Sequence, residues 1–280
     1  MKLDLCIIKP IIERALLEDI GTGDLTTNLM DLKDEISEVK IVVNDEGIIA
    51  GLEVAELVFK TVDPQIGFTK KVSDGESVSS SEIVAFITGK VGSVLSSERV
   101  ALNFLSRLSG IATKTRKFVE KVKPFPVKIV DTRKTTPGLR ILERYAVAVG
   151  GGYNHRFGLY DGILIKDNHI RIVGGVAEAV KLVKRKATHT LKIEIEVENL
   201  EQVKEAVDSG VDIIMLDNMD FPTLNEAVRF IKGNSKAIIE VSGGVSLSNV
   251  TQIAETGVDL ISIGELTHSA PIVDYSLEII

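Results

Sequence analysis

The spacing of apolar and polar positions divides the chain into two regions with different rhythms. In the first, up to about residue 110, short segments of alternating or continuous apolar residues lie between turn-forming Gly, Asn and Asp residues. One helical pattern covers 10–18 and another lies near 51–61. These features predict a small α+β sandwich domain, in which short connections join strands over 38–43, 47–50, 67–72 and 82–90.

In the second region, strand patterns alternate with helical patterns at 174–186, 200–209, 222–232 and 246–256. Gly210 and Gly257 follow two of these helices, and glycine commonly ends a helix. Repeated strand–helix units imply a parallel sheet. Closure is favoured because no strand is followed by the GxGxxG loop of an open dinucleotide-binding sheet. Six units, against the usual eight, predict an incomplete α/β barrel of about six strands.

A further helix is predicted to begin where Ser96 and Ser97 offer an N-cap. Its apolar residues share one face by their i, i+4 spacing: Val100, Phe104, Leu105 and Leu108. Arg99 would then lie in the first turn, where the helix dipole disfavours a cation. Two interpretations of Arg99 stay open, a surface pair with Glu98 and a contact with an anionic ligand.

The composition excludes several classes of protein. The 280 residues are 44% hydrophobic and 26% charged, which suits an ordinary globular chain with a real core. The net charge of −7 argues against nucleic acid or an acidic membrane as the main partner. The single Cys6 excludes an internal disulfide and fits a reducing compartment. With no signal peptide and no apolar run near the ~20 residues of a membrane helix, we expect a soluble, cytoplasmic protein.

A local excess of cations stands against this acidic balance. Between Asp131 and Arg171, seven Lys or Arg residues and four acids give a local charge of +3. Cations gathered in this way indicate a small anionic ligand.

The ends of the predicted strands carry charged or glycine-rich residues. Active sites of α/β barrels lie at these ends. Each residue alone has a structural interpretation: Lys166 could pair with Glu196, and Asp217 could cap the next helix. The joint pattern favours a site formed by Arg133, Lys134, Lys166, Glu196, Asp217, Ser242-Gly243-Gly244 and Gly264.

The residue types in this set suggest a pocket with two halves. Arg133 and Arg156 can bind carboxylates through two parallel hydrogen bonds. Glu196 and Asp217 are hard oxygen ligands suited to Mg²⁺ that carries phosphates. The segments 242–244 and 262–264 follow or end the last two strands, where barrels often bind phosphate through backbone N–H groups.

Other chemistries find less support. The four histidines and one cysteine show no zinc spacing, and the chain has neither a GxSxG elbow nor a P-loop. His155 is the best functional histidine because Arg156 follows it, whereas His189 and His268 are interpreted as structural. Gly150–Gly152 could bind phosphate or serve close packing, and the loop 18–27 is interpreted as a structural turn.

Eight motifs lie in order along nearly the whole chain: ALLEDIGTGDLTT (15–27), SERVALNFLSRLSGIAT (97–113), DTRKTTPGLR (131–140), GGGYNHRFGLYDGILIKDNHI (150–170), EIEVENL (194–200), IMLDNM (214–219), EVSGGV (240–245) and GVDLISIGELTHS (257–269). Together they resemble those of quinolinate phosphoribosyltransferase, the carboxylating nicotinate-nucleotide pyrophosphorylase. No departure occurs at the expected functional positions.

The resemblance implies a pentosyltransferase that converts quinolinate and phosphoribosyl pyrophosphate into nicotinate mononucleotide, pyrophosphate and CO₂, with Mg²⁺, in NAD biosynthesis. It implies an N-terminal domain, 1–110 with 269–280, closed by a C-terminal helix, and a barrel domain over 111–268. It also implies a homodimer, or possibly a hexamer, whose sites are completed by the partner subunit.

The same resemblance assigns roles to residues. Arg99 would reach the neighbour's site, Arg133, His155 and Arg156 would hold quinolinate, and Thr132 is expected among the substrate-binding residues. Lys134 and Lys166 would lie between the two substrates. Glu196 and Asp217 would hold the ribose hydroxyls and Mg²⁺, which makes Lys134, Lys166, Glu196 and Asp217 the expected catalytic residues. The 5′-phosphate would bind Ser242, Gly243, Gly244, Ile263, Gly264 and Glu265.

Three alternatives stay open. A related transferase could act on another aromatic acid, or Lys166 could form the Schiff base of an aldolase. A non-catalytic, anion-binding barrel belongs to a different class, although mere binding does not require both Glu196 and Asp217.

Overall fold

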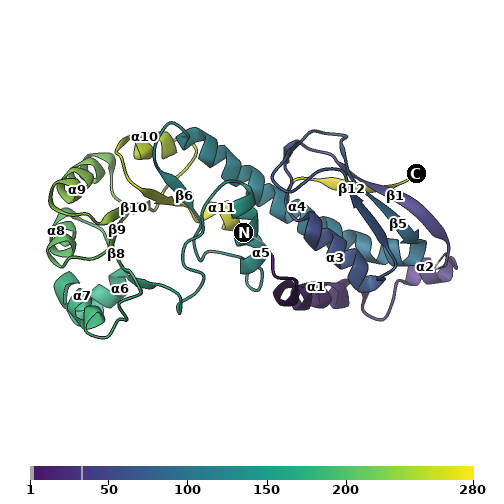
Figure 1. The fold of residues 1–280 in the computed structure, drawn as a ribbon, viewed down its shortest axis with the longest axis horizontal. Helices are drawn as coiled ribbons and strands as arrows, with labels where there is room; N and C mark the ends of the chain where they lie inside the picture. The colour runs from purple at the N-terminus through teal and green to yellow at the C-terminus, as the bar shows by residue number, and fades with distance from the viewer. Residues whose placement is uncertain (1–2, 33) are drawn as a thin grey trace. The chain divides into compact units, whose positions relative to one another are not determined.

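The computed structural model describes residues 3–32 and 34–280, and the contacts between them divide the chain into two compact units (Figure 1). The first unit holds the described residues up to Arg116 together with Thr135–Gly151 and Glu265–Ile280. The second unit holds Lys117–Lys134 and Gly152–Gly264. Within the described ranges, none of the helices combines the length and the apolar character needed to cross a membrane.

The first unit contains two antiparallel sheets. The larger has the strand order β12 (Tyr275–Ile279), β1 (Ile36–Val43), β5 (Ile83–Lys90) and β3 (Gly67–Lys70). The smaller pairs β2 (Gly47–Ile48) with β4 (Ser77–Val78). These elements confirm the predicted α+β organisation. The helices are α1 (Leu5–Ile20), α2 (Leu25–Leu29), α3 (Leu52–Val62), α4 (Val91–Val122, of which Lys117 onward is assigned to the second unit), α5 (Arg140–Val149) and α11 (Glu265–His268).

The prediction of a C-terminal helix is wrong, because the last segment forms strand β12. It pairs with β1 so that Tyr275 lies opposite Val43 and Ile279 opposite Val39. The residues alternate in the manner of a strand, and the buried Tyr275 donates its hydroxyl hydrogen to Ser109 Oγ at 3.0 Å. The C-terminal segment therefore joins the first unit by extending its sheet.

The predicted start of the long helix is also wrong. α4 begins at Val91, so Ser96 and Ser97 lie inside the helix and do not cap it. The Ser97 hydroxyl instead donates to the carbonyl of Ser93, four residues earlier, at 2.5 Å. Arg99 accordingly lies beyond the first two turns, where the dipole argument does not apply. Its guanidinium is exposed and 3.9 Å from Glu98.

The compact units differ from the predicted domains chiefly at Thr135–Gly151, which belongs to the first unit. The fully buried Glu143 of α5 explains this placement, since its Oε1 accepts hydrogen bonds from Arg107 Nη2 of α4 and from the Thr136 hydroxyl at 2.8 and 2.7 Å. A Cβ atom on Gly150 would lie 2.5 Å from the Ala112 carbonyl oxygen. For Gly150, close packing on α4 is therefore the better interpretation.

The second unit is built on a six-stranded parallel sheet, as predicted. The strand order is β6 (Lys128–Val130), β11 (Leu260–Ser262), β10 (Ile238–Ser242), β9 (Ile213–Asp217), β8 (Ile193–Val197) and β7 (Ile163–Ile165). In the described part of the chain β6 and β7 do not pair with each other, so the barrel is incomplete. Its helices are α6 (Asp167–Val173), α7 (Val176–Lys184), α8 (Leu200–Asp208), α9 (Phe221–Asn234) and α10 (Val250–Glu255).

The two faces of this sheet carry different side chains. Apolar residues such as Ile195, Ile214 and Val241 form the outer face, along which α8 and α9 lie in Figure 1. The register places Glu196 and Glu240 level with Met215, one on each side of β9. We call this second face, which carries the buried polar residues Glu194, Glu196, Glu240 and Ser262, the inner face.

Candidate active site

The second unit places most of the predicted site residues at one edge of its sheet. These residues lie at or just beyond the C-terminal ends of strands, and in a parallel sheet these ends meet at one edge, whereas His155 and Arg156 lie in the loop before β7. The set comprises Thr132, Arg133 and Lys134 after β6, Lys166 after β7, Glu196 in β8, Asp217 in β9, Ser242, Gly243 and Gly244 at β10, and Ile263 and Gly264 after β11. Arg99 and Glu265 belong to the first unit.

Arg133 and Arg156 lie close enough to influence each other. Burial lowers the pKa of Arg156 most, and the positive charge of Arg133 lowers it further, against the opposing charges of Glu194 and Asp161. The guanidinium of Arg156 is oriented by Nη1, which donates to the Gly162 carbonyl at 2.9 Å. Two guanidinium groups held together in this way favour a ligand that carries more than one negative charge.

The segment before Arg156 is held by one buried carboxylate, that of Asp131. Asp131, which is fully buried, accepts hydrogen bonds from the Asn154 amide at 2.6 Å and from the His155 backbone N–H at 2.8 Å. His155 Nδ1 accepts the backbone N–H of Arg156 at 2.7 Å. Hydrogen bonds thus connect Asp131, at the end of β6, through His155 to the backbone of Arg156, the predicted carboxylate-binding residue.

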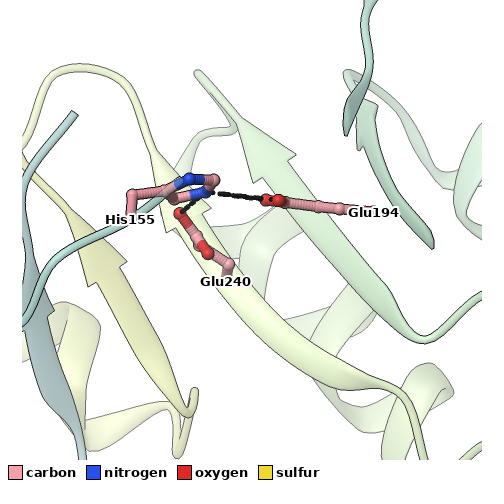
Figure 2. Close-up of side chains that lie close together, drawn as sticks. All are labelled: His155, Glu194 and Glu240. Atoms are coloured by element: carbon pink, nitrogen blue, oxygen red, sulfur yellow. Dashed lines mark hydrogen bonds and ion pairs between the residues drawn. The ribbon is translucent and has the colours of Figure 1, made fainter. Parts of the chain in front are cut away.

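The other ring nitrogen of His155 faces two acids (Figure 2). Nε2 lies 3.2 Å from Glu194 Oε2 and 3.6 Å from Glu240 Oε1. Sequence reasoning missed both acids, although they share strand parity with Glu196 and Ser242 and therefore face the same side. Both ring nitrogens of His155 have partners within the unit, so the ring connects the two acids to the backbone of Arg156.

Lys166 and Glu196 form the ion pair that the sequence left open. Lys166 Nζ donates to Glu196 Oε2 at 2.5 Å. The Lys166 side chain is 43% exposed, whereas that of Glu196 is only 10% exposed. The ammonium group is therefore available to a ligand while it compensates the charge of a nearly buried carboxylate.

Asp217 does not cap the next helix, because α9 is capped by the side chain of Asp220. Its Oδ2 instead accepts a hydrogen bond from the Asn218 amide at 2.7 Å. Asn218 has a left-handed backbone (φ 52°), which asparagine tolerates, and its N–H donates to the Ser242 carbonyl at 3.0 Å. Asn218 was not predicted, and it links a predicted metal ligand to the predicted phosphate-binding turn.

The turn after β10 requires glycine at Gly243. This residue has a φ of 86°, and a Cβ atom there would lie 2.2 Å from Asn218 Oδ1. Gly244 has a φ of 61° but no neighbour within 4 Å. Both glycines line a pocket with Asn218, Ser242 and Asn249, and the rest of its wall is apolar: Leu216, Met219, Phe221, Leu224, Val241 and Ile253.

The chemistry of the two strand-end acids fits a hard cation. Glu196 and Asp217 offer carboxylate oxygens from neighbouring strands. Mg²⁺ in phosphate sites commonly takes one or two carboxylates and completes its shell with phosphate oxygens and water. One oxygen of Glu196 already bonds Lys166, which leaves its other oxygen and those of Asp217 to be considered as ligands.

Family models for the two domains of one enzyme match this chain. The model described as quinolinate phosphoribosyl transferase, C-terminal domain, matches residues 111–278. The model for the N-terminal domain of the same enzyme matches residues 24–109. The two matches together cover most of the sequence.

Known relatives agree with the family models. A probable nicotinate-nucleotide pyrophosphorylase (carboxylating) of Bacillus subtilis is 44% identical over 272 residues, or 97% of this chain and 93% of the relative. One from Synechocystis is 44% identical over 275 residues, 98% of this chain and 93% of the relative. The crystal structure of NadC from Streptococcus pyogenes superposes with a TM-score of 0.94 at 41% identity, covering 100% of this chain and 99% of the other. The chain belongs to the quinolinate phosphoribosyltransferase family.

Proposed function

We propose that this enzyme transfers the phosphoribosyl group of phosphoribosyl pyrophosphate to quinolinate and releases pyrophosphate and CO₂, which yields nicotinate mononucleotide. Family membership supports the reaction class. The observation that carries the proposal is the site in the second unit, where paired arginines, the Lys166–Glu196 ion pair and Asp217 occupy one edge of the sheet.

The arginine half of this site suits quinolinate, which carries two carboxylates. Arg133 and Arg156 repel each other in the free protein. A bound dianion relieves this repulsion, so its binding gains from both charges. Thr132 lies beside them, and its hydroxyl accepts the backbone N–H of Lys134 at 3.1 Å, which orients this strand end.

The acidic half suits the ribose and diphosphate of the second substrate. Glu196 and Asp217 would hold the ribose hydroxyls and Mg²⁺, which when bound supplies positive charge to the departing pyrophosphate. The segments 242–244 and 263–265 would bind the 5′-phosphate. Lys134 and Lys166 would lie between the substrates and stabilise negative charge that develops there.

The reaction requires no nucleophile from the protein. The pyridine nitrogen of quinolinate attacks ribose C1 as the bond from C1 to pyrophosphate breaks, and the ring nitrogen becomes cationic. As CO₂ leaves, the electron pair of its bond stays at C2, where the adjacent cationic nitrogen stabilises it, and C2 then takes up a proton from water to give nicotinate mononucleotide. The side chains of the site therefore hold, orient and desolvate the two substrates.

We further propose a cytoplasmic homodimer or hexamer in which Arg99 of one subunit completes the site of its neighbour. The acidic composition and the single cysteine support the cytoplasm. The exposed guanidinium of Arg99 supports a role outside its own helix. Arg99→Ala and Lys166→Ala proteins, each nearly inactive, should regain activity when their subunits are mixed. Subunit exchange without recovery would contradict a shared site.

The decisive experiment incubates the purified protein with quinolinate, phosphoribosyl pyrophosphate and Mg²⁺. Nicotinate mononucleotide and CO₂ should appear in equal amounts. Binding of both substrates without product would instead indicate an anion-binding protein, and product only from other aromatic acids would indicate a related transferase. Borohydride trapping without a covalent adduct would remove the aldolase. Lys181→Ala, at an exposed ion pair on α7, serves as the control for Lys166→Ala and should keep full activity.

A further inference from the structure

The strongest unexplained feature of the second unit is an acid on the inner face of β10. Glu240 is 1% exposed, and its Oε1 has no hydrogen-bond partner among the residues that the structure describes. It lies level with Met215 and Leu260 on the neighbouring strands, and the carboxyl of Glu194 is close enough to repel it. Two carboxyl groups buried together oppose folding, so the fold alone does not account for them.

His155, Glu194 and Glu240 contain the donor atoms of a metal site, but the histidine points to another role. The three candidate ligand atoms, one from each residue, lie within 4.8 Å of one another. A histidine that binds a metal commonly donates its other ring N–H to a neighbour. Here the other nitrogen, Nδ1, accepts the N–H of Arg156, so the ring proton belongs on Nε2, the nitrogen that faces the acids. The cluster is therefore arranged to hold a proton.

The protonation of His155 is decided by two opposing influences. Burial lowers the pKa of His155, while the hydrogen bond to Glu194 and the charges of Glu194 and Glu240 raise it and prevail. A second proton on Nδ1 would, however, break the hydrogen bond from Arg156. A single proton on Nε2, donated to Glu194, therefore satisfies both ring nitrogens.

We propose that Glu194 and Glu240 are positioning residues for quinolinate, which hold the imidazole of His155 in one tautomer and thereby fix the backbone at Arg156. The inference rests on the proposed function, which assigns Arg156 to quinolinate. Glu194 accepts the Nε2 proton, the Glu240 carboxyl lies 3.6 Å from the same nitrogen and favours a proton there by its charge, and Nδ1 accepts the Arg156 N–H (Figure 2). The guanidinium of Arg156 is oriented by its hydrogen bond to the Gly162 carbonyl.

The test replaces Glu240 by Met and, separately, by Gln. Met removes the acid, so the KM for quinolinate should rise about tenfold, the lower end of what loss of an orienting partner costs. The KM for phosphoribosyl pyrophosphate should change less than about twofold. Gln keeps an acceptor oxygen and should restore most of the quinolinate affinity. Met215→Leu replaces an uncharged neighbour of Glu240 on the same face and keeps all three residues of the cluster, so both KM values should stay near those of the parent.

A spectroscopic readout keeps the inference separate from the proposed function. Imidazole ¹⁵N NMR, with His155 assigned by its loss in His155→Asn, should show the Nε2–H tautomer in the parent and a mixture in Glu240→Met. Because Glu240→Met removes a buried charge, its melting temperature should not fall. An unchanged spectrum and unchanged quinolinate KM would overturn the inference, and so would equal losses for both substrates with a lower melting temperature. If the parent forms no nicotinate mononucleotide, the proposed function fails, and the tautomer still tests whether the two acids hold His155.

Discussion

The outer and inner faces of the six-stranded sheet lie on the same strands and are both buried, yet their side chains differ in kind. On β8, Ile195 of the outer face and Glu194 of the inner face are 0% and 4% exposed. On β10 the corresponding residues are Val241 and Glu240, at 5% and 1%. Burial alone therefore does not explain which residues occupy the inner face.

The difference separates what folding requires from what the chemistry requires. Apolar side chains on the outer face gain free energy by leaving water. Carboxyl groups on the inner face lose solvation and repel one another, so they must be compensated by His155, Lys166 and Ser262 or remain costly. Proteins commonly accept such a cost at functional sites. Substitutions on the inner face should therefore lower activity more than stability, and those on the outer face should lower stability more than activity.

Asp217→Asn should have the largest effect on activity. The amide keeps the size of the side chain but loses the charge proposed to hold Mg²⁺, so kcat should fall about 10²- to 10³-fold. The melting temperature should change little because Asp217 is only partly buried. Mn²⁺ binding, followed by electron paramagnetic resonance in the presence of phosphoribosyl pyrophosphate, should weaken in parallel. Full activity with normal Mn²⁺ binding would remove Asp217 from the metal site.

Ile214→Ala should give the opposite signature. Ile214 lies on the outer face of β9 and is fully buried, so truncation should lower the free energy of unfolding by about 3 kcal/mol. Because its side chain points away from the inner face, kcat and both KM values at a temperature where the variant is folded should stay within about twofold. Chemical denaturation and steady-state assays measure the two quantities. A loss of kcat comparable to that of Asp217→Asn would contradict the separation of structural and catalytic roles between the two faces.

The alternation of apolar strands and helices was enough to predict the second unit, because each strand–helix step is local in sequence. The C-terminal segment was predicted wrongly because a distant contact decides its structure. β12 pairs with β1 across more than two hundred residues, a contact that local periodicity does not report. The start of α4 was misplaced because Ser96 and Ser97 resemble caps, whereas the helix already includes the buried Val94.

The candidate site was predictable where a charged residue stands at a strand end, as with Lys166 and Asp217. Glu194 and Glu240 were missed because single acids inside apolar strands give a weak local signal. The alternation in IEIEV did contain it, since Glu194 and Glu196 must share a face. Asn218 was missed because its importance depends on the close approach of Gly243.

The stability of the protein should depend on pH through Glu240. Burial, and then the charge of Glu194, raises the pKa of Glu240 from 4.5 to about 7, against His155 and Ser262. A raised carboxyl pKa gives stability that is fully present below the unfolded value and is lost as the pH rises through the folded value. Between about pH 4.5 and 7 this loss amounts to up to about 3 kcal/mol. Relative to the parent, Glu240→Met should become more stable over this range in urea titrations. A constant difference between the two proteins would show that Glu240 titrates normally.

The smallest expected effect separates two neighbouring glycines on the turn after β10. Gly243→Ala places a methyl group 2.2 Å from Asn218 Oδ1 and strains a left-handed backbone, so it should cost about 2 kcal/mol and raise the KM for phosphoribosyl pyrophosphate. Gly244→Ala shares the left-handed backbone but meets open space, so its cost should be near 1 kcal/mol. Denaturation curves and the two KM values provide the comparison. If both variants lose the same stability and affinity, backbone strain alone explains the losses. The close approach of Gly243 to Asn218, which hydrogen-bonds Asp217, then has no specific role.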